Sequence, residues 1–584
     1  MADTVFQFAK TDKLGVVAAV DTSHVVIDVD NAGLLTRVGI GGLVAIEGLS
    51  GNDRLIAVIE RVTRSVGEVP PLIGDDSGRD LDPADKPIDR IKCALIGTFY
   101  AQHGSRKNVF KRGADSFPQI DRTCHFIDAG NLQRLMGLLG QGLAESERLK
   151  LGCFLNDASA HAIASGDRFF QRHAALLGST GAGKSWAVAL LLERAAQLKH
   201  SNIIVFDLHG EYEPLCDSAK GGYARRFRIA GPGDLDAPTA DALFLPYWLL
   251  NRDQMLSMLL DRSDMNAPNQ ASRFTYHVRQ LKHAKLVAEG KDEVAHTFTV
   301  DSPVPYLLGD LLNELNADNV RKGTGSSGRE VKGEWEDKLT RFISRLEVKL
   351  EDRRYGFMFQ PPAAANTYDW LAQQVVDLLS ADDAHPGIKI VDFSEVPADV
   401  LPVVTGVFAK LLYDVQVWMD PAKRTPVCVF CDEAHLYLPT REDADAVQKA
   451  ALGAFERIAK EGRKYGFSLV VVSQRPADVS RTILSQCNNF LALRLTNEAD
   501  QAVVRRLMPD ALAGMVDVLP LLDTGEALLL GDAILLPSRV RLDKPTVEPA
   551  SSTREFWREW RDRKPDIAAI TEAVEALRRQ TRRK

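Results

Sequence analysis

Cysteine, uninterrupted apolar sequence and excess positive charge are all scarce in this chain of 584 residues. Its 7 cysteines are too few for a disulfide framework in a chain of this length. No segment reaches about 18 uninterrupted apolar residues, so we predict no membrane-spanning helix and no membrane partner. The opening segment MADTVFQFAKTDKLG lacks the apolar core of a signal peptide, and we therefore expect a cytoplasmic protein.

The charge balance limits how the protein meets nucleic acid. The formal net charge is −7, whereas a protein that binds nucleic acid over its whole surface is normally basic. Contact with DNA would therefore be local, as in a lined pore. With 45% hydrophobic and 26% charged residues, the chain is typical of globular proteins, and its length predicts several domains.

The first part of the chain predicts a small β-barrel. The segments VVAAVDTSHVVIDVD and GGLVAIEGLSGNDRLIAVIERV alternate apolar and polar residues over short runs with tight turns. A third run, IKCALIGTF, follows a connection rich in proline and aspartate. Regular short strands joined by tight turns favour a barrel, which we assign to residues 1–150.

From residue 151 the pattern changes to that of an α/β fold. HAALLG, NIIVFDL, GIKIVDF, PVCVFCDE and FSLVVVSQ are continuous apolar runs, as in strands buried on both faces of a mostly parallel sheet. We assign this core to residues 151–250 and 386–545. Between them, residues 251–385 predict a helical insertion, because amphipathic segments such as EWEDKLTRFISRLEVKLEDRR occur there. Residues 546–584 predict a charged helical tail.

A glycine-rich segment between a predicted strand and a predicted helix gives the strongest signal for chemistry. It fits the P-loop pattern G-x-x-x-x-G-K-[ST], which binds nucleoside triphosphates, and it predicts ATP and Mg²⁺ as cofactors. Lys184 would reach the β- and γ-phosphates, and the Ser185 hydroxyl would ligate Mg²⁺. The helix N-terminus adds partial positive charge. The predicted nucleotide-binding residues are Gly178, Ser179, Thr180, Gly181, Ala182, Gly183, Lys184 and Ser185.

Two acidic residues end a second apolar strand, PVCVFCDEAH. In a P-loop ATPase, an aspartate at this place holds Mg²⁺ through water, and we predict this role for Asp432. Glu433 directly after it is placed to polarise the attacking water. The alternative is that both residues cap the following helix. Agreement of this strand with the P-loop favours the catalytic interpretation.

The next apolar strand, FSLVVV, ends in Ser473 and Gln474. A glutamine at the end of this strand can hydrogen-bond the γ-phosphate and the attacking water, and it would then report the nucleotide state to the rest of the domain. The alternative is a polar residue that simply terminates a strand.

Three arginines are candidates for contacts with the transferred phosphate. Arg457 and Arg463 lie on a predicted helix, ALGAFERIAKEGRKYG, that ends at Gly466. Six positions apart, they point about 120° away from one another, so one could face a neighbouring subunit's nucleotide while the other faces elsewhere. Arg172 precedes the P-loop strand. For each arginine, a solvated surface position is the alternative.

The segment FDLHGEYE, after the next strand, carries Asp207, His209 and Glu211. A metal-binding triad is conceivable, but the segment has no second pair of ligands. A supporting role beside the Mg²⁺ site and helix capping are the other interpretations, and the residues alone leave them open.

Together these motifs resemble the HerA branch of the HerA/FtsK superfamily of ring-shaped DNA-pumping ATPases. The resemblance rests on RHAALLGSTGAGKS, VFDLHGEY, FCDEAH, RIAKEGRKYGFSLVVVSQRP and ILSQCNNFLALRLTNEAD in this order, and it spans nearly the whole chain. The N-terminal β-segment resembles the small barrel (HAS-barrel) that HerA proteins carry ahead of the ATPase. The resemblance implies a RecA-like P-loop core of the ASCE class with a helical subdomain.

This resemblance implies an ATP hydrolase of the helicase or translocase type that forms a homohexamer and acts on double-stranded DNA. Arg463, within EGRKYG, would be an arginine finger acting in trans, and Arg172 would be a second arginine that contacts phosphate. HerA-like proteins often work with a nuclease, or in phage defence with a nuclease or an NAD-degrading effector.

Two other functions stay open. One is an ATP-dependent scaffold that assembles and licenses a defence effector, an NADase or a nuclease, with little translocation of its own. The other is a cytosolic ATPase of a conjugation or secretion complex. Basic clusters at 220–228 and 322–332 are candidate DNA contacts, although solvated charge is the better interpretation of such clusters.

Overall fold

The structure, a computed structural model, divides into two compact units, and each unit is built from three separate segments of the chain. Unit 1 comprises Met1–Arg194, Val471–Ala477 and Leu484–Thr546, and unit 2 comprises Ala195–Val470, Asp478–Ile483 and Val547–Lys584. The described residues are 5–49, 53–66, 87–104, 106–114, 116–141, 143–155, 157–324, 329–382, 386–444, 446–551 and 554–581. No helix in these ranges has the length and apolar character needed to cross a membrane. All seven cysteines are free.

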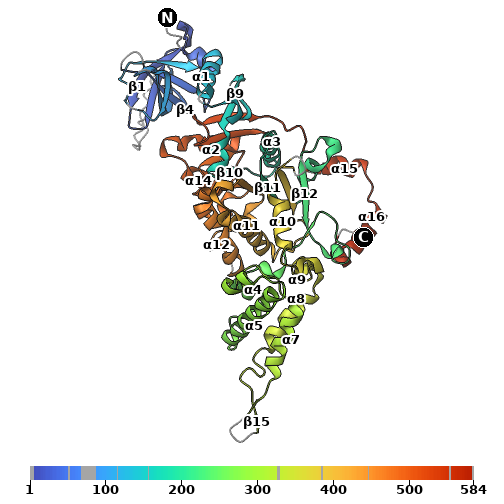
Figure 1. The fold of residues 1–584 in the computed structure, drawn as a ribbon. Coiled ribbons are helices and arrows are strands. Elements are labelled where there is room, and N and C mark those ends of the chain that lie inside the picture. The colour runs from blue at the N-terminus through green and yellow to red at the C-terminus, as the bar shows by residue number, and fades with distance from the viewer. Residues whose placement is uncertain are drawn as a thin grey trace, which may run out of the picture. The chain divides into compact units, whose positions relative to one another are not determined.

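Unit 1 begins with a closed antiparallel barrel (Figure 1). The strand order is β2-β1-β7-β3-β4-β5, and pairing of β2 with β5 closes the cylinder, while β6 is added beside β5. Two register shifts in the β4–β5 pair lie between Ile56 and Ala57 and between Ile59 and Arg61. Such bulges bend strands, and these strands curve around the barrel. The strands are β1 (Lys13–Val20), β2 (His24–Val29), β3 (Leu43–Glu47), β4 (Asp53–Val66), β5 (Pro87–His103), β6 (Arg106–Arg112) and β7 (Thr123–Ile127).

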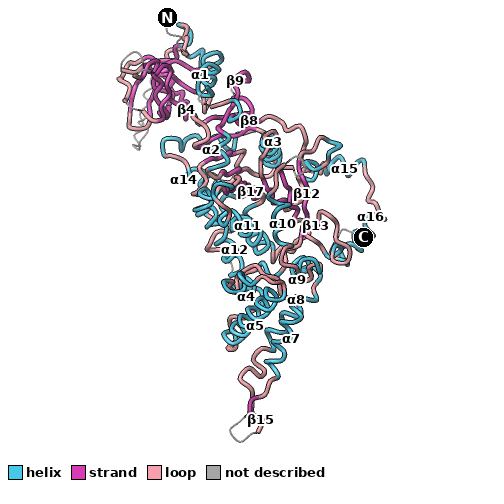
Figure 2. Tube along the Cα trace, viewed as in Figure 1, coloured by secondary structure: helices cyan, strands magenta, loops and turns pink. Residues whose placement is uncertain are grey.

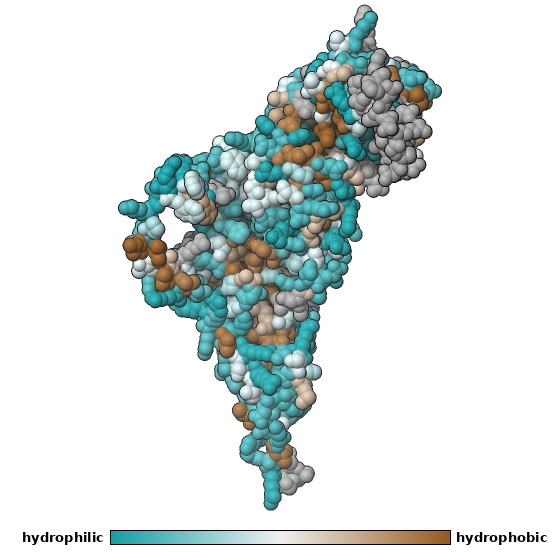
Figure 3. Space-filling view, turned by 180° about the vertical axis from the view of Figure 1, so that it is seen from behind, coloured by the Kyte–Doolittle hydropathy of each residue, from teal (hydrophilic) through white to brown (hydrophobic). Residues whose placement is uncertain are grey.

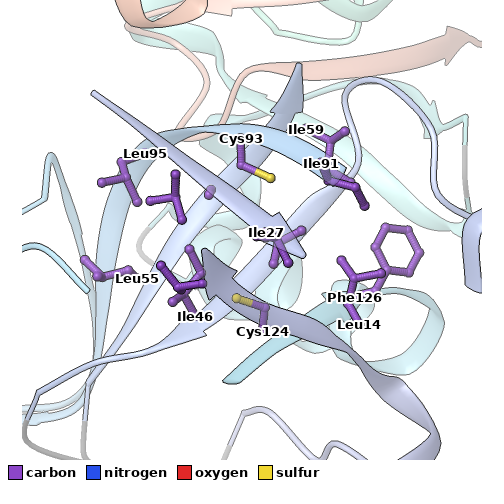
Figure 4. Close-up of a cluster of buried hydrophobic side chains, with 14 of the residues drawn as sticks. Leu14, Ile27, Ile46, Leu55, Ile59, Ile91, Cys93, Leu95, Cys124 and Phe126 are labelled. Atoms are coloured by element: carbon purple, nitrogen blue, oxygen red, sulfur yellow. The ribbon is translucent and has the colours of Figure 1, made fainter. Parts of the chain in front are cut away.

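The alternation of apolar and polar residues that predicted the barrel sends the apolar side chains inward. Figure 4 shows these side chains meeting inside the cylinder. Two cysteines, Cys93 and Cys124, lie among them, and burial raises the pKa of both thiols, which therefore stay protonated and pack as small apolar groups. The labelled members of the cluster are Leu14, Ile27, Ile46, Leu55, Ile59, Ile91, Cys93, Leu95, Cys124 and Phe126.

The rest of unit 1 is a mixed sheet with helices. In the order β10-β19-β20-β21-β8-β9, only β10 and β19 are parallel, and the other neighbours are antiparallel. Its strands are β8 (Arg148–Phe154), β9 (Asp157–Ser165), β10 (Ala174–Leu177), β19 (Asn489–Ala492), β20 (Glu526–Gly531) and β21 (Ser538–Leu542). Its helices are α1 (Ala129–Gln141), α2 (Gly166–Gln171) and α14 (Glu498–Leu507), and α3 (Lys184–Ala196) and α13 (Arg481–Leu484) have residues in both units.

Unit 2 contains the parallel strands that the apolar runs predicted. The order is β13-β12-β16-β11-β17, followed by the first residues of β18, and the neighbours from β13 to β17 are all parallel. Every residue of β11, β16 and β17 is buried, as expected for strands covered on both faces. The strands are β11 (Ile203–Asp207), β12 (Ala224–Ile229), β13 (Ala242–Leu243), β16 (Ile388–Asp392), β17 (Val427–Cys431) and β18 (Phe467–Ser473), and the accompanying helices are α10 (Trp370–Leu379), α11 (Leu401–Trp418) and α12 (Ala446–Glu461).

A helical insertion follows β13 in unit 2 (Figure 2). Its predicted amphipathic helix is present, with Phe342, Ile343 and Leu346 buried along one stripe. The short strands β14 (Gly323–Thr324) and β15 (Glu330–Val331) pair with each other, and residues 325–328 lie outside the described ranges. The helices are α4 (Arg252–Leu259), α5 (Ala267–Ala288), α6 (Asp292–Thr297), α7 (Leu308–Val320), α8 (Thr340–Glu351) and α9 (Gly356–Phe359).

The tail of the chain forms α15 (Phe556–Asp562) and α16 (Ile567–Arg579). Ile567, Ile570, Val574 and Leu577 make an exposed apolar stripe on α16, and brown side chains mark it at the left of Figure 3. The predicted fold class, an α/β P-loop core with an N-terminal barrel and a helical insertion, is confirmed. The domain boundaries near residues 150, 250, 385 and 545 stay predictions.

The barrel core generates a stability prediction. Ile27 is fully buried, so Ile27→Ala should lower the free energy of unfolding by about 2–5 kcal/mol through lost apolar contact and a residual cavity. Val62 on β4 is 39% exposed, so Val62→Ala should change it by less than about 0.5 kcal/mol. Scanning calorimetry of the full chain measures both, and equal shifts for the two variants would contradict the placement of Ile27 in the core.

Candidate active site

The P-loop of unit 1 joins β10 to α3, as predicted. Gly178 donates its backbone N–H to the Ser473 carbonyl oxygen at 3.2 Å, and Ser179 donates to the Arg494 carbonyl oxygen at 2.8 Å. A Cβ atom on Gly178 would lie 2.7 Å from the Leu493 Cβ, so the first glycine of the motif is required by close packing. The loop therefore begins in a fixed position against two neighbouring chain segments.

Two further glycines give the loop its turn. Gly181 has φ +74° and Gly183 has φ +99°, a left-handed region that a side chain disfavours. Open space lies in front of Gly181, since no described atom falls within 4 Å of the Cβ position. Here the backbone geometry, and not packing, requires glycine. The result is a loop whose backbone N–H groups suit a bound phosphate.

Side chains and backbone groups brace the loop on both sides. The Thr180 hydroxyl donates to the Gln474 Oε1 atom at 2.6 Å, which joins the loop to the residue directly after β18. On the other side, the Thr524 hydroxyl donates to the Gly181 carbonyl oxygen at 3.3 Å, and the Gly525 N–H donates to the Ala182 carbonyl oxygen at 3.3 Å. The predicted sensor Gln474 is thus in direct contact with the P-loop.

The loop presents a cation at its end. Lys184 is the first residue of α3 and is half-buried, and it has no ion pair within the described ranges. The unpaired N–H groups at the start of a helix add partial positive charge at the same place. Ser185 follows on the first turn of the helix. Both residues stand where the P-loop pattern requires them, and the positive end suits an anionic phosphate.

In unit 2, two acidic residues follow β17 and adopt different backbone conformations. Asp432 follows the strand and is only 5% exposed. Glu433 adopts φ 44° and ψ 44°, a left-handed conformation that is uncommon for a residue with a side chain. Its carboxylate lies near His435, with 3.3 Å between the Oε2 and Nδ1 atoms. Strained backbone of this kind is frequent at functional sites.

Asp432 lies in surroundings that suit a bound cation. Its Oδ2 atom accepts a hydrogen bond from the Tyr212 hydroxyl at 3.2 Å, and its Oδ1 atom accepts from the Glu433 N–H at 3.0 Å. Burial first, and then the nearby carboxylates of Glu433, Asp207 and Glu211, raise the pKa of Asp432. Within the described ranges it has no ion pair. A divalent cation would compensate this buried cluster of negative groups.

The FDLHGEYE segment forms a turn around Asp207. Its carboxylate accepts backbone N–H groups from His209 at 3.3 Å, Glu211 at 3.0 Å and Tyr212 at 3.0 Å. Burial raises the pKa of Asp207 to about 6, against the lowering effect of these hydrogen bonds. Among the described residues no group of three or more potential ligands could hold a metal ion, so the conceivable metal triad is not formed. Asp207 instead organises the loop.

The three candidate arginines differ in their surroundings. Arg172, in unit 1, forms an ion pair with Asp532, which also pairs with Arg112 of the barrel at 3.3 Å. In unit 2, Arg457 pairs with Glu461 at 3.3 Å and lies over the Tyr413 ring. Arg463 lies in a 3₁₀ turn after α12. It is exposed and has no ion pair in the described part of the chain.

The chain is similar in sequence to known helicases. The family described as "Helicase HerA, central domain" matches residues 149–412. A probable helicase of Methanocaldococcus jannaschii is 28% identical over 450 residues, which cover 76% of this chain and 75% of the relative. The DNA double-strand break repair helicase HerA of Sulfolobus acidocaldarius is 25% identical, over 68% of this chain and 69% of its own length. The chain is an ATPase similar to the HerA helicases.

Solved structures include more distant similarities. The VirB4 protein of Thermoanaerobacter pseudethanolicus is 17% identical over 69% of this chain and 98% of that chain, with a TM-score of 0.44. At this score the likeness supports no conclusion about function. The HerA-like ATPase is an ATP hydrolase on the evidence of its sequence relatives and its own P-loop.

Sequence reasoning about this HerA-like ATPase missed two contributions. Thr524 and Gly525 support the P-loop although they lie far from it in the chain. Thr524 is more than 300 positions from Gly181, which it contacts, and its segment has no recognisable motif. Tyr212 stands inside FDLHGEYE, but only the fold shows that its hydroxyl meets Asp432.

The distribution of the predicted site residues over the two units is also a result of the fold. The P-loop, Arg172 and Gln474 belong to unit 1, and Asp432, Glu433, Arg457 and Arg463 belong to unit 2.

The acidic residue after β17 generates a kinetic prediction. Glu433→Gln removes a carboxylate that would take a proton from the attacking water, so kcat should fall by about 10²–10⁴ while nucleotide binding is kept. Lys184→Ala should instead weaken nucleotide binding as well as hydrolysis, because it removes the cation that meets the phosphates. Phosphate release and nucleotide binding are measured for both. Normal turnover by Glu433→Gln would show that Glu433 is not the base.

Proposed function

We propose that this HerA-like ATPase is a ring-shaped translocase or helicase that moves on double-stranded DNA and works with a partner nuclease or a phage-defence effector. The relatives named as DNA double-strand break repair helicases support DNA as the track, and the partner is the one that the resemblance to HerA proteins implies. A cytoplasmic location goes with this proposal.

One contact supports ATP-driven motion more than any other. The hydrogen bond between Thr180 and Gln474 ties the P-loop to the end of β18. The first residues of β18 belong to unit 2 and its last residues to unit 1. A change at the γ-phosphate that moved Gln474 would therefore act on a strand that contributes to both units. A movement of Gln474 during hydrolysis would therefore be transmitted along β18 to the residues that this strand contributes to unit 2.

The chemical roles follow from the residues. The N–H groups from Gly178 to Ser185 and the Lys184 ammonium hold the phosphates, while the Ser185 hydroxyl and Asp432 hold the metal. Bound Mg²⁺ would neutralise charge that develops on the transferred phosphoryl group. Glu433 orients the attacking water and takes its proton, and Gln474 contacts the γ-phosphate.

Arg463 is the favoured finger for a neighbouring active site. Arg457 and Arg172 are held by ion pairs within their own chain, whereas the exposed Arg463 is not so held within the described ranges. Gly466, with φ +67°, ends the turn that carries Arg463. A residue that completes the next subunit's site requires a heterologous contact, which closes only as a ring. We propose a homohexamer, with Arg172 as a second phosphate contact once it leaves Asp532.

DNA dependence separates the candidate functions. Double-stranded DNA should raise the ATPase rate several-fold, and its apparent affinity should fall as salt rises, because phosphate contacts release counterions. The measurement is steady-state hydrolysis over a series of DNA and salt concentrations. Hydrolysis independent of DNA, with stable co-purification of an effector, would favour the scaffold. Co-fractionation with membranes would favour an ATPase of a conjugation or secretion complex.

Mixed rings test the finger. Lys184→Ala subunits still donate Arg463, and Arg463→Ala subunits still present an intact P-loop. In randomly mixed equimolar rings, about a quarter of the interfaces pair a good P-loop with a good finger, so activity should return from near zero toward that fraction of the wild-type rate.

The matched control mixes Arg463→Ala subunits with a Lys184→Ala, Arg463→Ala double variant, which supplies no finger and should stay inactive. Ring composition is verified by native mass spectrometry. If verified mixed rings of the two single variants stay as inactive as their parents, Arg463 does not act across the interface.

A further inference from the structure

Tyr212 is a fully buried tyrosine whose ring and hydroxyl have different partners. Its exposed fraction is 0%, and its hydroxyl donates to the Asp432 Oδ2 atom at 3.2 Å. In this contact the phenol hydroxyl is the donor and the carboxylate is the acceptor.

The backbone of the same residue is fixed from a second side. The Tyr212 N–H donates to the Asp207 Oδ2 atom at 3.0 Å, and the Glu211 N–H donates to the Oδ1 atom at 3.0 Å. Asp207 ends β11, which is parallel to β17, with Phe206 opposite Cys431. The two aspartates therefore follow equivalent positions of adjacent strands. The closed turn from Asp207 to Tyr212 carries the Tyr212 hydroxyl from one strand end to the other.

The two donors on Asp432 fix its orientation. The Tyr212 hydroxyl meets Oδ2 and the Glu433 N–H meets Oδ1, so both oxygens are held while each keeps further lone-pair capacity. A metal-ligating carboxylate held in this way binds its ion without first having to be ordered.

We propose that Tyr212 is a positioning residue for the metal ligand Asp432, and that the FDLHGEY turn holds Tyr212 in place for this role. This inference rests on the proposed nucleotide site, in which Asp432 holds Mg²⁺. It assigns to the segment the supporting role that the sequence left open beside metal binding and capping. Tyr212 itself touches neither nucleotide nor metal.

The test removes one oxygen atom. Tyr212→Phe keeps the ring and its packing but removes the donor, so the affinity for Mn²⁺ in the presence of ADP should fall by about tenfold, in the usual range for loss of a supporting partner. Electron paramagnetic resonance counts the bound Mn²⁺ without any turnover. The affinity for ADP in EDTA should stay unchanged, and high Mg²⁺ should restore most of the ATPase rate.

The matched control is Tyr247→Phe, which also removes the hydroxyl of a buried tyrosine. The Tyr247 hydroxyl donates to the Tyr306 carbonyl oxygen in the helical insertion and does not contact Asp432. Its Mn²⁺ affinity should match that of the wild type. Equal Mn²⁺ affinity for Tyr212→Phe and wild type overturns the inference, as does an equal loss in both variants. If the wild type binds ADP but no Mn²⁺, the metal site itself fails. That result is distinct from a failure of Tyr212.

Discussion

A carboxylate buried at the end of a parallel strand is the constraint on which much of unit 2 depends. Asp432 is surrounded by other acids, and such a group is costly to bury unless donors or a cation compensate it. The strand register places Asp207 at the matching position of β11. Asp207 is itself occupied by backbone N–H groups, so it shapes a turn while Asp432 is left to meet a metal.

Much of the fold was predictable because its signals are local. Continuous apolar runs predicted β10, β11, β16, β17 and β18, since a strand covered on both faces needs apolar residues at every position. Alternation predicted the barrel for the complementary reason. What the sequence could not show was which strands close the barrel, because the pairing of β2 with β5 joins segments far apart in the chain.

The candidate site divides in the same way. The P-loop and the acidic pair were predictable because a few adjacent residues provide the chemistry. The ion pair between Arg172 and Asp532 joins positions 360 residues apart, and nothing near either residue indicates it. The contact of Tyr212 with Asp432 is separated by 220 positions. Only the fold shows where the hydroxyl lies.

The closed barrel has an outer strand, β6, that pairs with β5 and ends the strand order. An outer strand has unpaired backbone N–H and C=O groups along one edge, with which a strand of another chain can pair. The sequence of β6, RKNVFKR, carries four cationic side chains on seven residues. A second copy of β6 laid alongside it would bring like charges together. Repulsion between these side chains opposes edge-to-edge pairing of two barrels, while the charge of Arg112 is compensated by its ion pair with Asp532.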